Sequence, residues 1–585
     1  MFVRIITSKG NKYLNIIDGY RDDNGKIKQK VIANLGRLDE LSCTSIENIA
    51  SKLLEFVKSD KTLTNKAKTP NLKELDRYNY GFIAYRNIWN RFKLDTILDT
   101  LIKQTNIQYD FKNVVFSIVV DRLLKPKSKL ATFINKDDYI NINDELKLHH
   151  IYRSLDILAS NKENIELALF AQNKNLFNIS TDIVFYDVTT FYYESKDENA
   201  LKKFGYSKDS KFGDVQVVMG MLIDKNGLPI GYELFSGNTM DTKTMVAILD
   251  KLKSKFQIDT VVIVADRGLN SKLNLKAIKD AGYDYLMACK IKSMNNEIQK
   301  DILNIANYSN IVNTKDTQEP LYSYYVKEYD NKVKYQQEVS LDASTGEVQY
   351  ETKEITLKEK LICTYSTKRA TKDMYDRYRA LQKANEIISK NQKSAISQTK
   401  SFKKYIFKET KDDSCKNFIM GLDWLKIKKD KTYDGFYAIT TSKTTLEPLE
   451  IIDNYHNLYK IEDSFRVLKS TFNTRPIYHH KESRIEAHFI VCFIAFMIER
   501  DLEIRLKNSK SFQDKIITPN GVKEALNSLE VSKIKIDNEI FYMRSNHSNQ
   551  KDKLQFGRDI HKFLRIPQLK NINTQDELIQ YIHTL

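Results

Sequence analysis

Between residues 182 and 290 short apolar runs alternate with helical patterns, and their order restricts the fold more than any other feature of the chain. Three apolar runs come first, and the turn 224–227 (DKNG) joins the second to the third, which predicts a hairpin. A helical pattern, a fourth run, another helical pattern and a fifth run follow. In order, the runs are DIVFYDVTT (182–190), DVQVVMGMLID (214–224), LPIGYELF (228–235), DTVVIVAD (259–266) and YDYLMACK (283–290). The predicted order is β-β-β-α-β-α-β.

The first and fourth of these runs carry apolar residues on both faces of the expected strand. Continuous apolar runs of this kind are typical of parallel strands covered on both faces. In the ribonuclease-H-like arrangement, strands in this order place the first and the fourth side by side and parallel. We therefore predict an α/β fold with a ribonuclease-H-like core.

Other patterns flank and interrupt this core. The first forty residues read as a small antiparallel meander, and the pattern from about residue 71 to 177 is helical. Polar β-like runs and a basic stretch follow residue 292. The predicted divisions are 1–178, a β-meander plus a mainly helical DNA-binding region; 179–292, the first part of the core; 293–430, a β-rich insertion; 431–500, the second part of the core; and 501–585, a C-terminal region that is a candidate for dimerisation.

The chain of 585 residues carries 93 Lys and Arg against 76 Asp and Glu, a net charge of +17. This excess fits a polyanionic partner such as nucleic acid, and it fits an AT-rich coding sequence equally well. The longest apolar run, Phe489 to Ile498, has ten residues, whereas a membrane span needs about 20. The N-terminus shows no secretory pattern. We therefore expect a cytoplasmic protein without a membrane partner.

The basic stretch lies within the predicted insertion, from Leu381 to Thr410. It carries seven lysines against two glutamates. The pattern is compatible with one helix whose charged face is solvated, or with a helix that contacts DNA, and the sequence does not separate the two.

Three carboxylates stand out by their location. Asp187 lies inside the first apolar run, Asp266 ends the fourth, and Glu462 lies in a later helical pattern, YHNLYKIEDSFRVLKS. A carboxylate among apolar strand residues is costly to bury unless it is paired or metal-bound. Two of them on neighbouring parallel strands would bring hard oxygen ligands together, which suits Mg²⁺ or Mn²⁺. The alternative is that both aspartates only cap strand ends.

The helical pattern around Glu462 has a regular spacing. Tyr455 precedes Glu462 by seven residues and Lys469 follows it by seven. Seven residues are close to two helical turns, so one continuous helix would place all three on one face. Such a face could hold a phosphodiester next to the metals. The alternative is an ordinary amphipathic helix.

These motifs together resemble the DDE transposases of bacterial insertion sequences, of the insertion-sequence-four superfamily. The resemblance rests on YDVTTFYYES, on VIVADRGLNSK and on the signature Tyr-x2-Arg-x3-Glu-x6-Lys, here Tyr455, Leu458, Glu462 and Lys469. Leu458 departs from the signature, which has Arg there. Arg466, one turn beyond Glu462, is the candidate to replace it.

The resemblance implies a cut-and-paste transposase. Such an enzyme would bind the terminal inverted repeats of its element, cleave DNA at the element ends and join the 3′ ends to target DNA. Asp187, Asp266 and Glu462 would be the catalytic residues and would bind two Mg²⁺ ions, with Mn²⁺ as a possible substitute, while Tyr455, Lys469 and Arg466 would position phosphate. The implied partners are double-stranded DNA and a second copy of the chain, in the bacterial nucleoid. Two other classes remain open: a ribonuclease-H-like nuclease that joins no strands, and a non-catalytic DNA-binding regulator derived from an element.

Overall fold

The computed structural model divides into two compact units. Unit 1 comprises Met1–Ile179, Thr190–Val217 and Ser464–Leu585, and unit 2 comprises Ser180–Thr189 and Val218–Asp463. The residues that the structure describes are 2–8, 10–21, 27–41, 48, 51, 73–103, 105–140, 146–177, 182–194, 196–206, 213–312, 320–341, 348–389, 402–410, 418–475, 477–536, 539–545 and 551–583.

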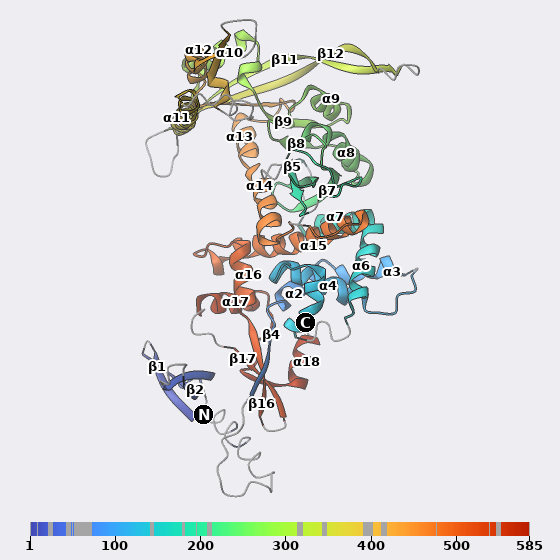
Figure 1. The fold of residues 1–585 in the computed structure, drawn as a ribbon, viewed down its shortest axis with the longest axis vertical. Coiled ribbons are helices and arrows are strands. Elements are labelled where there is room, and N and C mark those ends of the chain that lie inside the picture. Colours follow the sequence, from blue (N-terminus) through green and yellow to red (C-terminus); the bar gives the residue numbers. More distant parts are fainter. Residues whose placement is uncertain are drawn as a thin grey trace. The chain divides into compact units, whose positions relative to one another are not determined.

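A nine-stranded sheet runs through unit 2 (Figure 1). Its strand order is β10-β11-β12-β15-β9-β8-β5-β6-β7. The strands are β5 (Ile183–Tyr192), β6 (Gln216–Asp224), β7 (Pro229–Ser236), β8 (Val262–Ala265), β9 (Asp284–Cys289), β10 (Ser309–Val312), β11 (Pro320–Leu341), β12 (Val348–Tyr365) and β15 (Phe436–Thr441). All five apolar runs that the sequence marks between residues 182 and 290 are strands of this sheet.

The two central strands pair as expected. β5 and β8 are parallel neighbours, with Ile183 opposite Val262 and Tyr186 opposite Ala265. β9 is parallel to β8 on its other side. The side chains of β5 and β8 are almost all buried, which explains why their sequences are apolar on both faces. The prediction that the first and fourth strands lie side by side and parallel is confirmed.

β6 and β7 are also neighbours, and the predicted turn joins them. Gly227 has a φ of +88°, a left-handed conformation that glycine adopts without steric cost. Asp224 fixes the turn, because its carboxylate accepts hydrogen bonds from the backbone N–H groups of Asn226 and Leu228 at 2.9 and 2.8 Å.

The predicted insertion extends this sheet. β11 and β12 form a long antiparallel hairpin, β12 pairs with β15, and β15 pairs antiparallel with β9. The polar alternation of these strands reflects sheet faces that are only partly covered, as in β11, where Val333 and Tyr335 are buried between exposed neighbours.

Helices complete unit 2. They are η2 (Asp241–Lys243), α8 (Met245–Asp250), the π-helical η3 (Lys251–Lys255), α9 (Lys272–Asp280), η4 (Ile291–Ser293), α10 (Asn296–Leu303), η5 (Ile305–Asn307), α11 (Thr367–Ser389), η7 (Lys403–Tyr405), α12 (Trp424–Lys431), α13 (Pro448–His456) and α14 (Tyr459–Arg466), the last residues of which belong to unit 1. A two-stranded sheet of β13 (Ile406–Thr410) and β14 (Phe418–Leu422) lies between η7 and α12 in the sequence.

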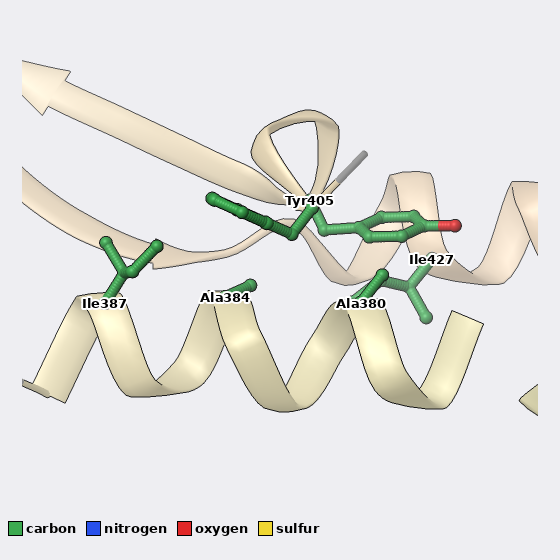
Figure 2. Close-up of a cluster of buried hydrophobic side chains, with 6 residues drawn as sticks. Ala380, Ala384, Ile387, Tyr405 and Ile427 are labelled. Carbon is green, nitrogen blue, oxygen red and sulfur yellow. The ribbon is translucent and has the colours of Figure 1, made fainter. Parts of the chain in front are cut away.

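One face of α11 carries its own small core. Ala380, Ala384 and Ile387, spaced three or four residues apart, pack against Tyr405 and Ile427 (Figure 2). The prediction of one basic helix from Leu381 to Thr410 is wrong, because α11 ends at Ser389 and residues 406–410 form β13. Lys390, Lys393 and Lys400 lie outside the described residues.

Unit 1 begins with the predicted meander. β1 (Phe2–Ser8), β2 (Asn11–Arg21) and β3 (Ile27–Arg37) form an antiparallel sheet in the order β1-β2-β3. The helices are α2 (Ile83–Arg91), α3 (Leu94–Ile102), α4 (Phe111–Leu124), α5 (Lys129–Ile134), η1 (Lys136–Asp138), α6 (Leu148–Ser160), α7 (Lys162–Phe177), the π-helical η8 (Val467–Thr471), α15 (Glu482–Lys507), η9 (Lys510–Phe512), α16 (Pro519–Asn527), α17 (Lys551–Phe563) and α18 (Gln575–His583).

The apolar run Phe489–Ile498 lies in α15, and all ten of its residues are buried. α15 packs against α4 and α6, so its apolar side chains form the core of unit 1. Among the described residues, no helix is long and apolar enough to cross a membrane.

The C-terminal region shares a sheet with the region after the meander. β4 (Lys73–Asn79), β16 (Glu530–Ile536), β17 (Glu539–Arg544) and β18 (Ile572–Thr574) pair in the order β18-β17-β16-β4. The prediction of helix from residue 71 is therefore wrong for residues 73–79. This stretch, KELDRYN, has little apolar character of its own, and it becomes a strand by pairing with β16, more than 450 residues later in the chain.

Candidate active site

Asp187 and Asp266 occupy matching positions on neighbouring parallel strands. Tyr186 lies opposite Ala265, so the next residue on each chain is one of the two aspartates. Asp187 is half-buried in β5, and Asp266 is exposed directly after β8. The carboxylate of Asp187 accepts a hydrogen bond from the N–H of Val188 at 2.7 Å. Both acids thus lie at the carboxyl end of the β5–β8 pair, the edge where ligands bind in many open α/β sheets.

Tyr455, which the sequence predicts to contact phosphate, lies beside Asp266. Its hydroxyl points to Oδ1 of Asp266 at 3.5 Å. The same hydroxyl is 2.7 Å from the hydroxyl of Tyr437, in β15. When Tyr455 donates to Asp266, Tyr437 is the donor to Tyr455. The structure therefore shows Tyr455 oriented toward a carboxylate.

Burial holds this tyrosine pair in the protonated form. It raises the pKa of Tyr455 well above its ordinary value, and the neighbouring Tyr437 and Asp266 raise it further. Burial also raises the pKa of Tyr437. Because both hydroxyls keep their protons at neutral pH, a chain of donors leads to Asp266.

Arg369 borders the tyrosine pair from the insertion. Its guanidinium carbon lies 4.2 Å from the centre of the Tyr437 ring, a cation–π geometry. Its Nε is 3.8 Å from Asp373, one turn further along α11. Arg267 follows Asp266 in the chain, and the charges of Arg369 and Arg267 both act to lower the pKa of Tyr437. No sequence signal indicated Tyr437 or Arg369, because neither lies in a motif and their partners are distant in the chain.

The predicted continuous helix from Tyr455 to Lys469 is interrupted. α13 ends at His456 and α14 begins at Tyr459. Asn457 ends α13, with its side-chain amide donating to the backbone oxygen of Asp453 at 3.0 Å. Beyond Arg466 the helix widens into the π-helical η8. The three residues therefore do not lie on one continuous, regular helix, and their exposure differs: Tyr455 is buried, Glu462 is exposed and Lys469 is intermediate.

The other predicted phosphate ligands belong to unit 1. Arg466 is exposed at the end of α14, and Nζ of Lys469 lies 5.6 Å from the ring of Phe191. Leu458, which replaces the signature arginine, is 6% exposed and fills an apolar position. The nearby insertion does supply a cation, Arg369, which contacts the neighbouring Tyr437.

The donor chemistry of the two aspartates fits a divalent cation. Carboxylate oxygens are the ligands that Mg²⁺ and Mn²⁺ prefer. Among the described residues, no group of three or more His, Cys, Asp or Glu side chains is close enough together to hold a metal ion. Of the three predicted catalytic acids, Asp187 and Asp266 are brought together by strand pairing. Glu462 does not form a three-residue cluster with them among the described residues.

Comparison with protein families identifies the family of the chain. The chain belongs to the transposase DDE domain family, which matches residues 179–498, more than half of its length. Residues 3–62 match the N-terminal domain of the IS1634 family of transposases. This match names the IS1634 family, where the sequence motifs indicated the insertion-sequence-four superfamily.

Two solved transposase structures are similar to parts of the chain. One is a piggyBac transposase synaptic complex with hairpin DNA, 8% identical, with 86% of this chain and 90% of that chain covered and a TM-score of 0.35. The other is a Mos1 transposase paired-end complex with the left transposon end, 13% identical, with 35% and 77% covered and a TM-score of 0.14. No curated protein matches the chain.

Proposed function

We propose that this protein is a cut-and-paste transposase with a ribonuclease-H-like core. It would bind the terminal inverted repeats of an insertion sequence, cleave DNA at the element ends and join the 3′ ends to target DNA. The observation that carries the proposal is the matched register of Asp187 and Asp266 on β5 and β8. Membership of the transposase DDE domain family supports it.

In this proposal Asp187, Asp266 and Glu462 would together hold two divalent cations, Mg²⁺ or Mn²⁺. When bound, such ions lower the pKa of an attacking water or 3′-hydroxyl and stabilise the leaving oxygen at phosphorus. Asp187 is held in place by the backbone of β5. Tyr455 and Tyr437 orient the carboxylate of Asp266.

The predicted phosphate ligands keep their roles in the proposal, with one change. Arg466 and Lys469 would contact DNA phosphates near the cleaved bond. The change concerns Tyr455, which is proposed to orient the carboxylate of Asp266 and not to contact phosphate. Because two element ends must be joined in one event, we also propose that a homodimer acts on paired ends.

A cleavage and joining experiment tests this function. A duplex that carries one inverted repeat and its flanking DNA is incubated with the protein and Mg²⁺, and a precut duplex is incubated with a supercoiled target. We expect a nick at the repeat end and joined products with the precut duplex. Asp187→Asn, Asp266→Asn and Glu462→Gln should each abolish both reactions while leaving DNA binding intact. Cleavage without joined products would identify a nuclease, and binding without either reaction would identify a regulator.

A further inference from the structure

A large cavity in unit 1 lies between the N-terminal meander and the C-terminal sheet. Its volume is about 800 Å³, and its walls come from β3, β4, β17 and α17. The meander is attached to the sheet by a small core, in which Ala33 of β3 packs with Ile534 and Met543. The side-chain amide of Asn571 also donates to the backbone oxygen of Leu35 at 3.4 Å. Segments from both ends of the chain therefore build one cavity.

The walls of this cavity are strongly basic. The lining contains six cationic side chains and two acidic ones. The cations are Lys30, Arg37, Arg77, Arg544, Lys551 and Arg558, and the acids are Glu40 and Asp552. Two of the cations have acidic partners, since Arg37 pairs with Asp39 at 2.5 Å and Arg77 with Glu74 at 2.5 Å. The lining as a whole carries four more cationic than acidic side chains.

Arg544 is fixed in the wall by neutral groups. Its guanidinium donates to the backbone oxygen of Leu569 at 3.1 Å and to Oδ1 of Asn571 at 2.7 Å. Its buried Nε has no hydrogen-bond partner among the described residues. These contacts orient the guanidinium without neutralising its charge, which leaves it suited to an anionic oxygen.

Arg558 lies close enough to Arg544 for the two charges to act on each other. The pKa of Arg558 is lowered, first by burial and then by the charge of Arg544, while Tyr80 acts in the opposite direction. Two guanidiniums in a partly buried wall repel each other, and an anion between them would relieve the repulsion. The cavity therefore combines preset donors with an excess of cationic side chains.

We propose that this cavity, lined by Lys30, Arg544, Lys551 and Arg558, binds the phosphodiester backbone of double-stranded DNA. The inference rests on the proposed function, and it gives the meander and the C-terminal region a shared role in holding DNA. Arg544 and Arg558 contact phosphate oxygens inside the cavity, and the exposed Lys30 and Lys551 contact phosphates at its rim. Backbone contacts of this kind position a protein on DNA and carry no base specificity.

Salt-dependent DNA binding by the full-length chain tests the proposal. Fluorescence anisotropy with a labelled duplex gives the dissociation constant between 50 and 300 mM salt. In B-DNA each neutralised phosphate contributes about 0.9 to the slope of log affinity against log salt. The double variant Lys30→Gln/Lys551→Gln should therefore lower the slope by about 1 to 2 and weaken binding about tenfold or more at low salt. Lys103→Gln/Lys510→Gln removes the same charge from exposed positions outside the cavity and should leave the slope unchanged.

The wall arginines are tested with a conservative pair of variants. Arg544→Gln should weaken binding, and Arg544→Lys, which keeps the charge, should retain most of the salt slope; thermal unfolding shows whether either variant is misfolded. Equal affinity and slope for the Lys30/Lys551 variant and its control would overturn the proposal. So would complete competition by millimolar inorganic phosphate at constant ionic strength, which would indicate a site for a small anion. A wild-type protein that binds DNA through this cavity but cleaves none would refute the proposed function and leave the cavity assignment standing.

Discussion

Removing the hydroxyl of Tyr455 distinguishes two roles for this residue: orienting the carboxylate of Asp266, or contacting a DNA phosphate. A hydrogen bond to a charged acceptor stabilises by about 1.5–3 kcal/mol when it is well formed. The Tyr455–Asp266 distance of 3.5 Å exceeds the usual range for O–H···O bonds, so we expect about 1 kcal/mol from this contact. Tyr455→Phe should then slow Mg²⁺-dependent cleavage by about five- to tenfold.

The assay is single-turnover cleavage of an end duplex over a range of Mg²⁺ concentrations. If Tyr455 orients Asp266, Tyr455→Phe lowers the rate and raises the Mg²⁺ concentration needed, and the dissociation constant for DNA stays unchanged. Tyr437→Phe should have a smaller effect in the same direction, because Tyr455 can still donate to Asp266. If Tyr455 instead contacts phosphate, the loss will be in DNA affinity.

Tyr283→Phe is the matched control. Tyr283 lies in the same unit and is buried, and its hydroxyl donates to the backbone oxygen of Ile258 at 2.6 Å. The variant loses one buried hydroxyl of the same kind, with no contact to either aspartate. An unchanged rate and Mg²⁺ dependence for Tyr455→Phe, equal to those of this control, would refute the orienting role.

Three further predictions follow from particular contacts. Arg369→Gln removes the cation over Tyr437 and should slow cleavage by about two- to fivefold, with Arg369→Lys in between, in the same single-turnover assay. Burial raises the pKa of Glu499 from 4.5 to about 8, so the folded chain keeps a proton that the unfolded chain releases between these values. The wild type should therefore lose stability relative to Glu499→Gln as pH rises from 5 to 8, by up to about 1.4 kcal/mol per pH unit in urea unfolding. Ala384→Leu overfills the core in Figure 2 and should destabilise that subdomain by about 1–3 kcal/mol, seen as faster limited proteolysis than in the exposed control Met374→Leu.

The sequence predicts the centre of the fold because burial there determines composition. β5 and β8 are covered on both faces, so their apolar runs identify them as central strands. Asp187 and Asp266 each directly follow one residue of the Tyr186–Ala265 pair, so strand pairing places them at the same level of the sheet. The meander is also predictable locally, because its alternating runs and the turns between them follow one another in the sequence. In each of these cases a local pattern reports directly on the environment of the segment.

The remainder depends on contacts that no local pattern contains. β4 becomes a strand only by pairing with β16, and Tyr437 reaches Tyr455 only because β15 joins the sheet beside β9. The spacing of Tyr455, Glu462 and Lys469 suggested a single helix, but the break at Asn457 and the π-helical turn of η8 alter the phase of their side chains. Seven-residue spacing predicts a shared face only where the helix is continuous and regular.

Replacing each aspartate with cysteine tests the central claim, that Asp187 and Asp266 hold the catalytic cation. A thiolate is a poor ligand for Mg²⁺, and Mn²⁺, which is less hard, accepts it more readily. Asp187→Cys and Asp266→Cys should be inactive in end cleavage with Mg²⁺ and should regain measurable cleavage with Mn²⁺, whereas the alanine variants should stay inactive with both ions. Cleavage at the wild-type rate in Mg²⁺ by either cysteine variant would contradict the account.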